Sequence, residues 1–132
     1  KDMHWPALQI CQELLRRGLG KDVARLLERS RPIRKSSLME ARQRPSPLEH
    51  AESMLCVEHE PRPERITIVD DVITRGATLL GGAWCVAQRF PNASIHGLAI
   101  VRTMSRQDVD RILDPVDQGR VHLLGETPRR DP

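Results

Sequence analysis

Two adjacent carboxylates are followed, after one residue, by a turn that suits a phosphate. Asp70 and Asp71 come directly after the apolar, β-branched run 66–69. The segment 73–78 follows them and leads into an apolar helical pattern. The first N–H groups of a helix lack partners within it and carry a partial positive charge, which favours an anion there. The predicted phosphate-binding residues are Ile73, Thr74, Arg75, Gly76, Ala77 and Thr78.

The carboxylates and the turn together favour a phosphorylated sugar as the ligand. Ligands of open α/β sheets bind beyond the carboxyl ends of the strands, where Asp70 and Asp71 are expected. Carboxylates accept hydrogen bonds from a sugar diol, directly or through a divalent metal, and Gly76 lets the backbone approach the ligand closely. The alternative is an ordinary strand-to-helix connection. The complete order of strand, two acids, apolar pair, T-x-G-x-T and helix favours binding, and it is neither a Walker A loop nor a G-x-G-x-x-G fingerprint.

This stretch resembles the signature of the type I phosphoribosyltransferases, which is an apolar strand, two acidic residues, an apolar pair and T-x-G-x-T. The matching residues are Asp70, Asp71, Thr74, Gly76, Ala77 and Thr78. The resemblance implies that the turn binds the 5-phosphate of phosphoribosyl pyrophosphate and that both aspartates are catalytic residues at the ribose hydroxyls. It also implies that Mg²⁺ accompanies the pyrophosphate, held by the aspartates directly or through the substrate. The implied activity is transfer of phosphoribose to or from a nitrogen base, a nucleotide being the product.

A basic pair and a polar segment are expected to complete this site. Arg34 and Lys35 lie where some members of the family carry an Arg-Lys pair that enters a mobile active-site loop. Residues 36–51 are polar, contain two prolines and are predicted to form that loop. Cations that close over the leaving pyrophosphate would stabilise its charge, and closure would exclude water. The alternative is that Arg34 and Lys35 are solvated loop charges.

The flanking patterns predict an α/β fold in which a parallel β-sheet is flanked by helices, as in the type I phosphoribosyltransferases. The whole chain, 1–132, is expected to be one domain with a C-terminal tail at about 125–132. The expected strands are 53–58, 66–69, 95–101 and 121–124, with a short extended piece at 31–35. The expected helices are 6–17, 23–27, 79–90 and 105–113.

Composition narrows the class of protein. Hydrophobic residues make up 39% and charged residues 30% of the sequence, which is typical of a globular domain rather than a disordered chain. The three cysteines are widely spaced and form no C-x-x-C, so reduced thiols in a cytoplasmic protein are expected. The net charge of +3 suits a small anion as well as nucleic acid, and no apolar run is long enough to span a membrane. We expect a homodimer or larger assembly.

The likeness to the family is incomplete at its start. The family holds pyrophosphate on a further loop after an earlier strand, and no such strand precedes the first helix here. Either Lys1 and Asp2 end that loop or it lies wholly upstream, so an N-terminal part of the family fold is expected to be missing. If the loop does not exist, the alternative is a non-catalytic module that binds phosphoribosyl pyrophosphate or a nucleotide. The more specific likeness is to the ComF-like branch, which is associated with DNA uptake.

Two further residues have open roles. His50 lies in the predicted mobile loop, where it either joins the chemistry or is a plain loop histidine. Arg102 follows a predicted strand and would lie at the same sheet edge as Asp71, where it contacts either the ligand or a neighbouring acid. The hood that covers the base in this family is not recognisable, so the acceptor base stays open.

Overall fold

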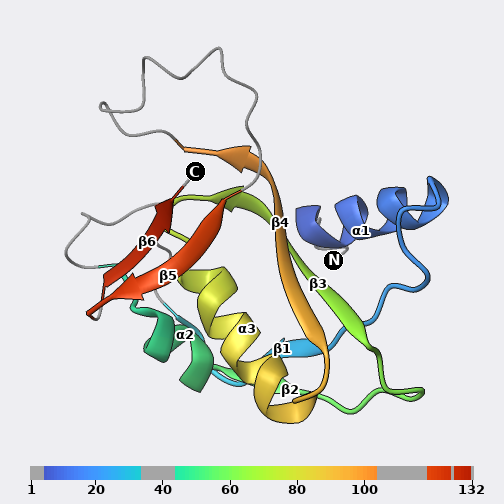
Figure 1. Cartoon of the computed structure of the whole chain (residues 1–132), viewed down its shortest axis with the longest axis horizontal. Helices are drawn as coiled ribbons and strands as arrows, with labels where there is room; N and C mark the ends of the chain where they lie inside the picture. The colour runs from blue at the N-terminus through green and yellow to red at the C-terminus, as the bar shows by residue number, and fades with distance from the viewer. Residues whose placement is uncertain (1–4, 34–43, 104–118, 126, 132) are drawn as a thin grey trace.

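The structure, a computed structural model, describes residues 5–33, 44–103, 119–125 and 127–131 and is mixed α/β (Figure 1). One parallel pair of strands lies between helices, and two short antiparallel pairs form separate two-stranded sheets. The helices are α1 (Pro6–Arg16), α2 (Pro47–Glu52) and α3 (Ala77–Arg89). The strands are β1 (Leu27–Arg29), β2 (Met54–Cys56), β3 (Arg65–Ile73), β4 (Ser94–Arg102), β5 (Arg120–Leu124) and β6 (Thr127–Asp131).

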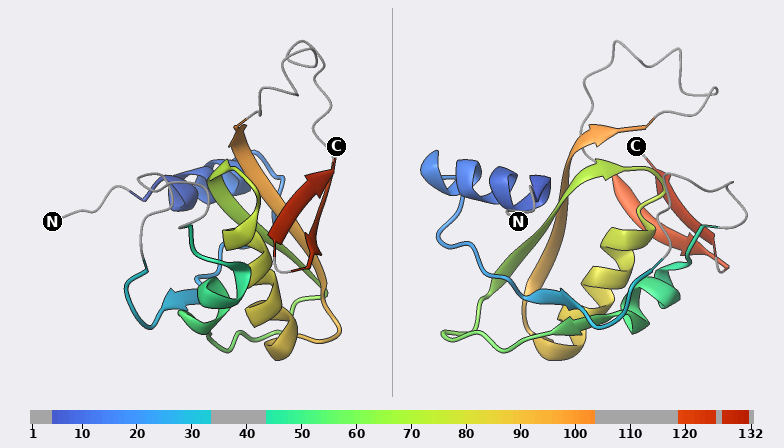
Figure 2. Two further views of the ribbon diagram at one scale, coloured as in Figure 1. Left: turned by 90° about the vertical axis from the view of Figure 1, so that its left-hand side faces the viewer. Right: turned by 180° about the vertical axis from the view of Figure 1, so that it is seen from behind.

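The parallel pair β3–β4 is the centre of the molecule. Its register runs from Arg65 opposite Ser94 to Ile73 opposite Arg102, and α3 connects the two strands. Helix α3 lies against one face of the pair and α1 against the other (Figures 1 and 2). The expected strand, helix and strand at 66–101 are therefore confirmed, each within a few residues of its predicted ends.

The core forms between β3–β4 and α3. Ile66, Val86 and Phe90 are its buried residues, and Val86 is only 1% exposed. Burying an aliphatic or aromatic side chain of this size contributes about 1.5–3 kcal/mol to folding. The partly buried residues around the three are Leu26, Leu27, Cys56, Ile68, Ala93 and Ile95. The packed layer thus joins β3–β4 and α3 to the small β1–β2 sheet.

Several expected elements differ in the structure. The strand at 53–58 exists as β2, but it pairs antiparallel with β1 instead of joining a larger parallel sheet. The helix expected at 23–27 is wrong, because Leu27 opens β1 opposite Cys56 and packs on the core from a strand. The C-terminal tail expected at about 125–132 is also wrong, since β6 pairs antiparallel with β5 around a turn at Gly125, φ +61°.

The loop predicted at 36–51 is wrong at its C-terminal end, where α2 begins at Pro47. Ser46 caps this helix: its hydroxyl accepts a hydrogen bond from Glu49 N–H, and the Glu49 carboxylate accepts one from Ser46 N–H. The expected helix 105–113 and residues 34–43, including Arg34 and Lys35, lie outside the described residues. In the part of the chain that is described, no helix is both long and apolar enough to cross a membrane.

Candidate ligand-binding site

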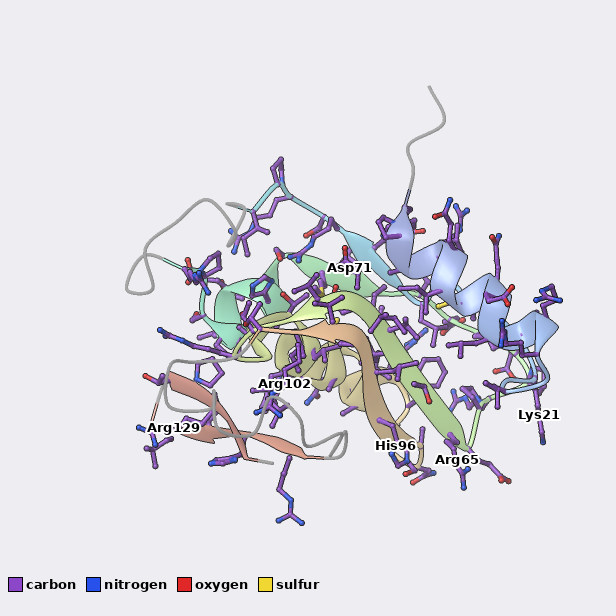
Figure 3. All side chains as sticks on the ribbon, turned by 90° about the horizontal axis from the view of Figure 1, so that it is seen from above. Lys21, Arg65, Asp71, His96, Arg102 and Arg129 are labelled. Atoms are coloured by element: carbon purple, nitrogen blue, oxygen red, sulfur yellow. The ribbon has the colours of Figure 1, made fainter. Side chains whose placement is uncertain are left out.

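Strand β3 continues past the predicted end at residue 69, so both aspartates lie inside the strand and not beyond it. Successive side chains of a strand point to opposite faces. Asp70 has the same parity as Ile66 and Ile68, which pack in the core beside α3. Asp71 has the opposite parity and belongs to the face against which α1 lies (Figure 3). Strand alternation alone would therefore send the two carboxylates to different faces.

Local hydrogen bonds nevertheless tie the pair together. Asp71 N–H donates to Asp70 Oδ1 at 3.0 Å, and Val72 N–H donates to Asp71 Oδ1 at 2.9 Å. Burial raises the pKa of Asp70, and a hydrogen bond with the Asp71 side chain acts in the same direction. The positive charge of Arg29 opposes this rise in the pKa of Asp70. Two acids this close repel each other when both are ionised, so a cation or a hydrogen-bond donor placed between them would be stabilised.

The turn after β3 leads directly into α3. Ile73 ends β3, Thr74 and Arg75 form the turn, and Gly76 occupies the N-cap position with φ +84°. Ala77 and Thr78 are the first helical residues, and within the described residues no side chain caps the helix. The uncapped N–H groups can therefore donate to an anion. All six residues predicted to bind a phosphate lie in this one segment.

Gly76 is required by its neighbours as well as by its backbone conformation. A Cβ at this position would lie 2.6 Å from Cγ1 of Val121 on β5, so no side chain fits. Sequence reasoning expected close approach to a ligand here. The structure shows close approach to the β5–β6 hairpin, which packs beside the turn (Figure 1), and the approach to a ligand stays a prediction.

Arg102 lies at the same end of the parallel pair as the turn. It stands opposite Ile73 in the register, and Thr103 N–H donates to the Ile73 carbonyl oxygen at 3.0 Å, which extends the pairing by one residue. Figure 3 labels Asp71 on β3 and Arg102 on β4. The predicted placement of Arg102 at the same end of the sheet as Asp71 is confirmed, and its role stays a prediction.

A buried polar cluster on α2 and β1 was missed by the sequence analysis. His50 is 3% exposed and Ser53 1%, so His50 is not a loop histidine. Arg29 donates to the Ser53 hydroxyl, and its Nη2 lies 3.1 Å from His50 Nδ1. Burial lowers the pKa of His50, and the Arg29 charge lowers it further. His50 is thus neutral at pH 7, with Nδ1 accepting from Arg29.

The proton of neutral His50 then belongs to Nε2, and this buried atom has no hydrogen-bond partner among the described residues. The Ser53 hydroxyl in turn donates to the His50 carbonyl oxygen at 2.8 Å. The sequence signal for this cluster was the capping box at 46–49, which places His50 in a helix. A search of protein-family models, curated proteins and solved structures gives no match to this chain.

Proposed function

We propose that this protein is a phosphoribosyltransferase of the type I kind, which binds phosphoribosyl pyrophosphate and transfers phosphoribose to or from a nitrogen base. The observation that carries the proposal is the pair Asp70 and Asp71 near the end of β3, followed at once by the uncapped start of α3. Acceptors for a sugar diol and donors for a phosphate thus lie within one short segment. The ligand that needs both is a ribose 5-phosphate.

Each part of the site has a distinct task in this proposal. The backbone N–H groups at residues 74–78 hold the 5-phosphate, assisted by the hydroxyls of Thr74 and Thr78. Asp71 accepts hydrogen bonds from the ribose hydroxyls, and Asp70 acts beside it. As the bond from C1 to pyrophosphate breaks, the ribose becomes an oxocarbenium-like cation, and nearby carboxylates stabilise that positive charge.

The two carboxylates also fit a magnesium ion. Mg²⁺ prefers oxygen ligands and is commonly bound by one or two carboxylates together with substrate phosphates. Among the described residues no group of three or more His, Cys, Asp or Glu side chains gathers around a possible metal. Asp70 and Asp71 would thus share the ion with the substrate, and bound Mg²⁺ would neutralise charge on the pyrophosphate.

The second candidate is a module that binds a phosphoribosyl compound or nucleotide without turnover. It is favoured by the size of the central sheet. Within the described ranges β3 pairs only with β4, so no strand on its other edge supplies a second loop for pyrophosphate. Such a module would keep the phosphate turn and the diol acceptors and would lack the groups that stabilise the leaving group.

Titration calorimetry with phosphoribosyl pyrophosphate and Mg²⁺ tests both candidates. Replacement of both acids, Asp70→Asn with Asp71→Asn, should weaken binding by about a hundredfold to ten-thousandfold, because each lost charge-assisted hydrogen bond costs about 1.5–3 kcal/mol. The matched control is Glu60→Gln with Glu64→Gln, which changes the net charge equally at two exposed positions. It should bind as the unaltered protein does.

Each outcome separates the candidates. Binding followed by pyrophosphate release with one of a panel of purine and pyrimidine bases supports the enzyme. Binding without release across the whole panel supports the module. If the unaltered protein does not bind phosphoribosyl pyrophosphate at all, both proposals are wrong. If the double asparagine variant binds it with unchanged affinity, Asp70 and Asp71 are not part of the site.

A further inference from the structure

Two of the three cysteines lie in the interface between β2 and α3. The thiol of Cys85, on α3, donates a hydrogen bond to the carbonyl oxygen of Met54 on β2, with 3.6 Å between sulfur and oxygen. Cys56 lies two residues further along β2 and packs against the core, to which α3 contributes Val86 and Phe90. Each cysteine therefore contacts the element that carries the other.

The side chain of Cys56 points to the α3 side of β2. Met54 and Cys56 are partly buried, whereas Leu55 between them is 59% exposed, as expected when successive side chains of a strand alternate in direction. Burial raises the pKa of the Cys85 thiol, and a hydrogen bond from the Cys56 backbone acts against this rise. The sulfur of Cys85 thus lies beside Cys56 as well as beside Met54.

Both thiols are free and partly exposed, so a small oxidant can reach them. The thiol of Cys56 donates to the Val57 carbonyl oxygen at 3.8 Å, and a thiol is only a weak hydrogen-bond donor. Little energy therefore holds either sulfur in its present direction. The third cysteine, Cys11, belongs to α1, which lies against the opposite face of the β3–β4 pair from α3 (Figure 1).

We propose that Cys56 and Cys85 form an oxidation site, at which hydrogen peroxide converts the two thiols into a disulfide that ties β2 to α3. One thiolate attacks a peroxide oxygen, the O–O bond breaks, and the sulfur becomes a sulfenic acid while the released hydroxide takes up a proton to give water. The second thiolate attacks that sulfur, the S–O bond breaks, and the oxygen leaves as a second water. Two thiols and one peroxide thus give one disulfide and two waters.

The disulfide would enclose the candidate site in a covalent loop. The chain from Cys56 to Cys85 contains β3 and the turn at residues 73–78, and it ends within α3. The bond would therefore join the two ends of the segment that carries both aspartates. This inference goes beyond the proposed function and does not depend on it, because it concerns only the packing of β2 against α3.

The test treats the full chain with hydrogen peroxide. A thiolate is the attacking form and burial raises the pKa of both thiols, so a mildly alkaline buffer is used. Free thiols are titrated, and tryptic peptides are identified by mass spectrometry without reduction. Arginines separate the three cysteines in the sequence, so each falls in a different tryptic peptide. The variants are Cys56→Ser, Cys85→Ser and, as the matched control, Cys11→Ser.

We expect the number of free thiols to fall from three to one, with the peptides of Cys56 and Cys85 linked within a single chain. The melting temperature should rise by about 5–15 °C on oxidation, because the bond restricts the unfolded chain, and should return on reduction with dithiothreitol. Cys11→Ser should form the same bond. Cys56→Ser and Cys85→Ser should form no disulfide within the chain.

Two kinds of result would overturn the inference. Three thiols that persist, or that become sulfinic acids without any linked peptide, would show that the two sulfurs do not meet in the folded protein. A bond that includes Cys11, or that joins two chains, would show that the β2–α3 interface does not select the pair. If Cys56→Ser or Cys85→Ser does not fold, the unaltered chain and Cys11→Ser still decide, because both keep the two thiols.

Discussion

The two faces of the β3–β4 pair are packed very differently. On the α3 face, Ile66, Val86 and Phe90 are buried, and α2 meets α3 so closely that Gly81 has no room for a Cβ. On the other face, α1 lies against β3 with no buried residue of its own. The α3 face is therefore tightly packed, and the α1 face is packed more loosely.

The two aspartates divide between these faces. By strand alternation Asp70 falls on the tightly packed face and Asp71 on the looser one, yet their side chains interact and raise the pKa of Asp70. The pair therefore lies where the two kinds of packing meet. Three predictions test the difference in packing between the two faces.

The largest effect is expected from Gly81→Ala. A Cβ there would lie 2.6–2.9 Å from His50 Cβ, the Pro47 carbonyl oxygen and the Ala51 nitrogen, so α2 must move. Although alanine normally favours a helix over glycine, we expect a loss of about 3 kcal/mol in the free energy of unfolding. Urea titration measures it.

Gly20→Ala is the control for this substitution, because a Cβ there would meet only the Asp22 carbonyl oxygen at 4.0 Å. It follows α1 and should change the free energy of unfolding by no more than about 0.5 kcal/mol. Equal losses in the two variants would show that the α2–α3 contact is no tighter than the chain after α1.

A smaller effect is expected from truncating side chains on the two faces. Val86→Ala removes two methyl groups from a side chain that is 1% exposed and should cost about 2 kcal/mol. Leu15→Ala on α1 removes more atoms, but that residue is 39% exposed, so it should cost less than about 1 kcal/mol. Thermal unfolding of both variants checks the order, and a reversed order would contradict the comparison.

The smallest effect concerns pH and His50. Burial, followed by the Arg29 charge, lowers the pKa of His50, and Glu49 acts against them. A histidine whose folded pKa lies below its unfolded value of about 6.5 contributes stability above that pH and loses it as pH falls through the folded pKa. The melting temperature should therefore fall between pH 7.5 and 5, and His50→Gln should reduce that fall. His96→Gln, at an exposed histidine, should leave it unchanged.

Local patterns made part of the fold predictable. The apolar periodicity of strand β3, helix α3 and strand β4 can be recognised within each segment alone. The structure contains all three elements. The apolar run at 53–58 also marked β2, although not its partner. Strand β1 has only three residues and β6 reads TPRRD, so neither pattern nor propensity marks these two strands. Helix α2 has a capping box, but the prolines around it favoured a loop.

The candidate site was likewise predictable where its residues are close together in sequence. The phosphate turn at residues 73–78 and the Asp70–Asp71 pair are contiguous in sequence, and the structure keeps them together. The sequence pattern underestimated the length of β3, which places both acids inside the strand. The cluster of Arg29, His50 and Ser53 joins residues that are far apart in sequence, and only tertiary packing brings them together.

The contact between Gly76 and Val121 has a consequence for how the protein matures. The ribosome makes the turn before it makes the hairpin that packs on it, so every nascent chain carries a turn that is still open on that side. Strands β5 and β6 are joined by a tight turn and can pair rapidly once they emerge, because hairpins form within microseconds. The turn at residues 73–78 would then gain its contact with Val121 only after the hairpin has been made.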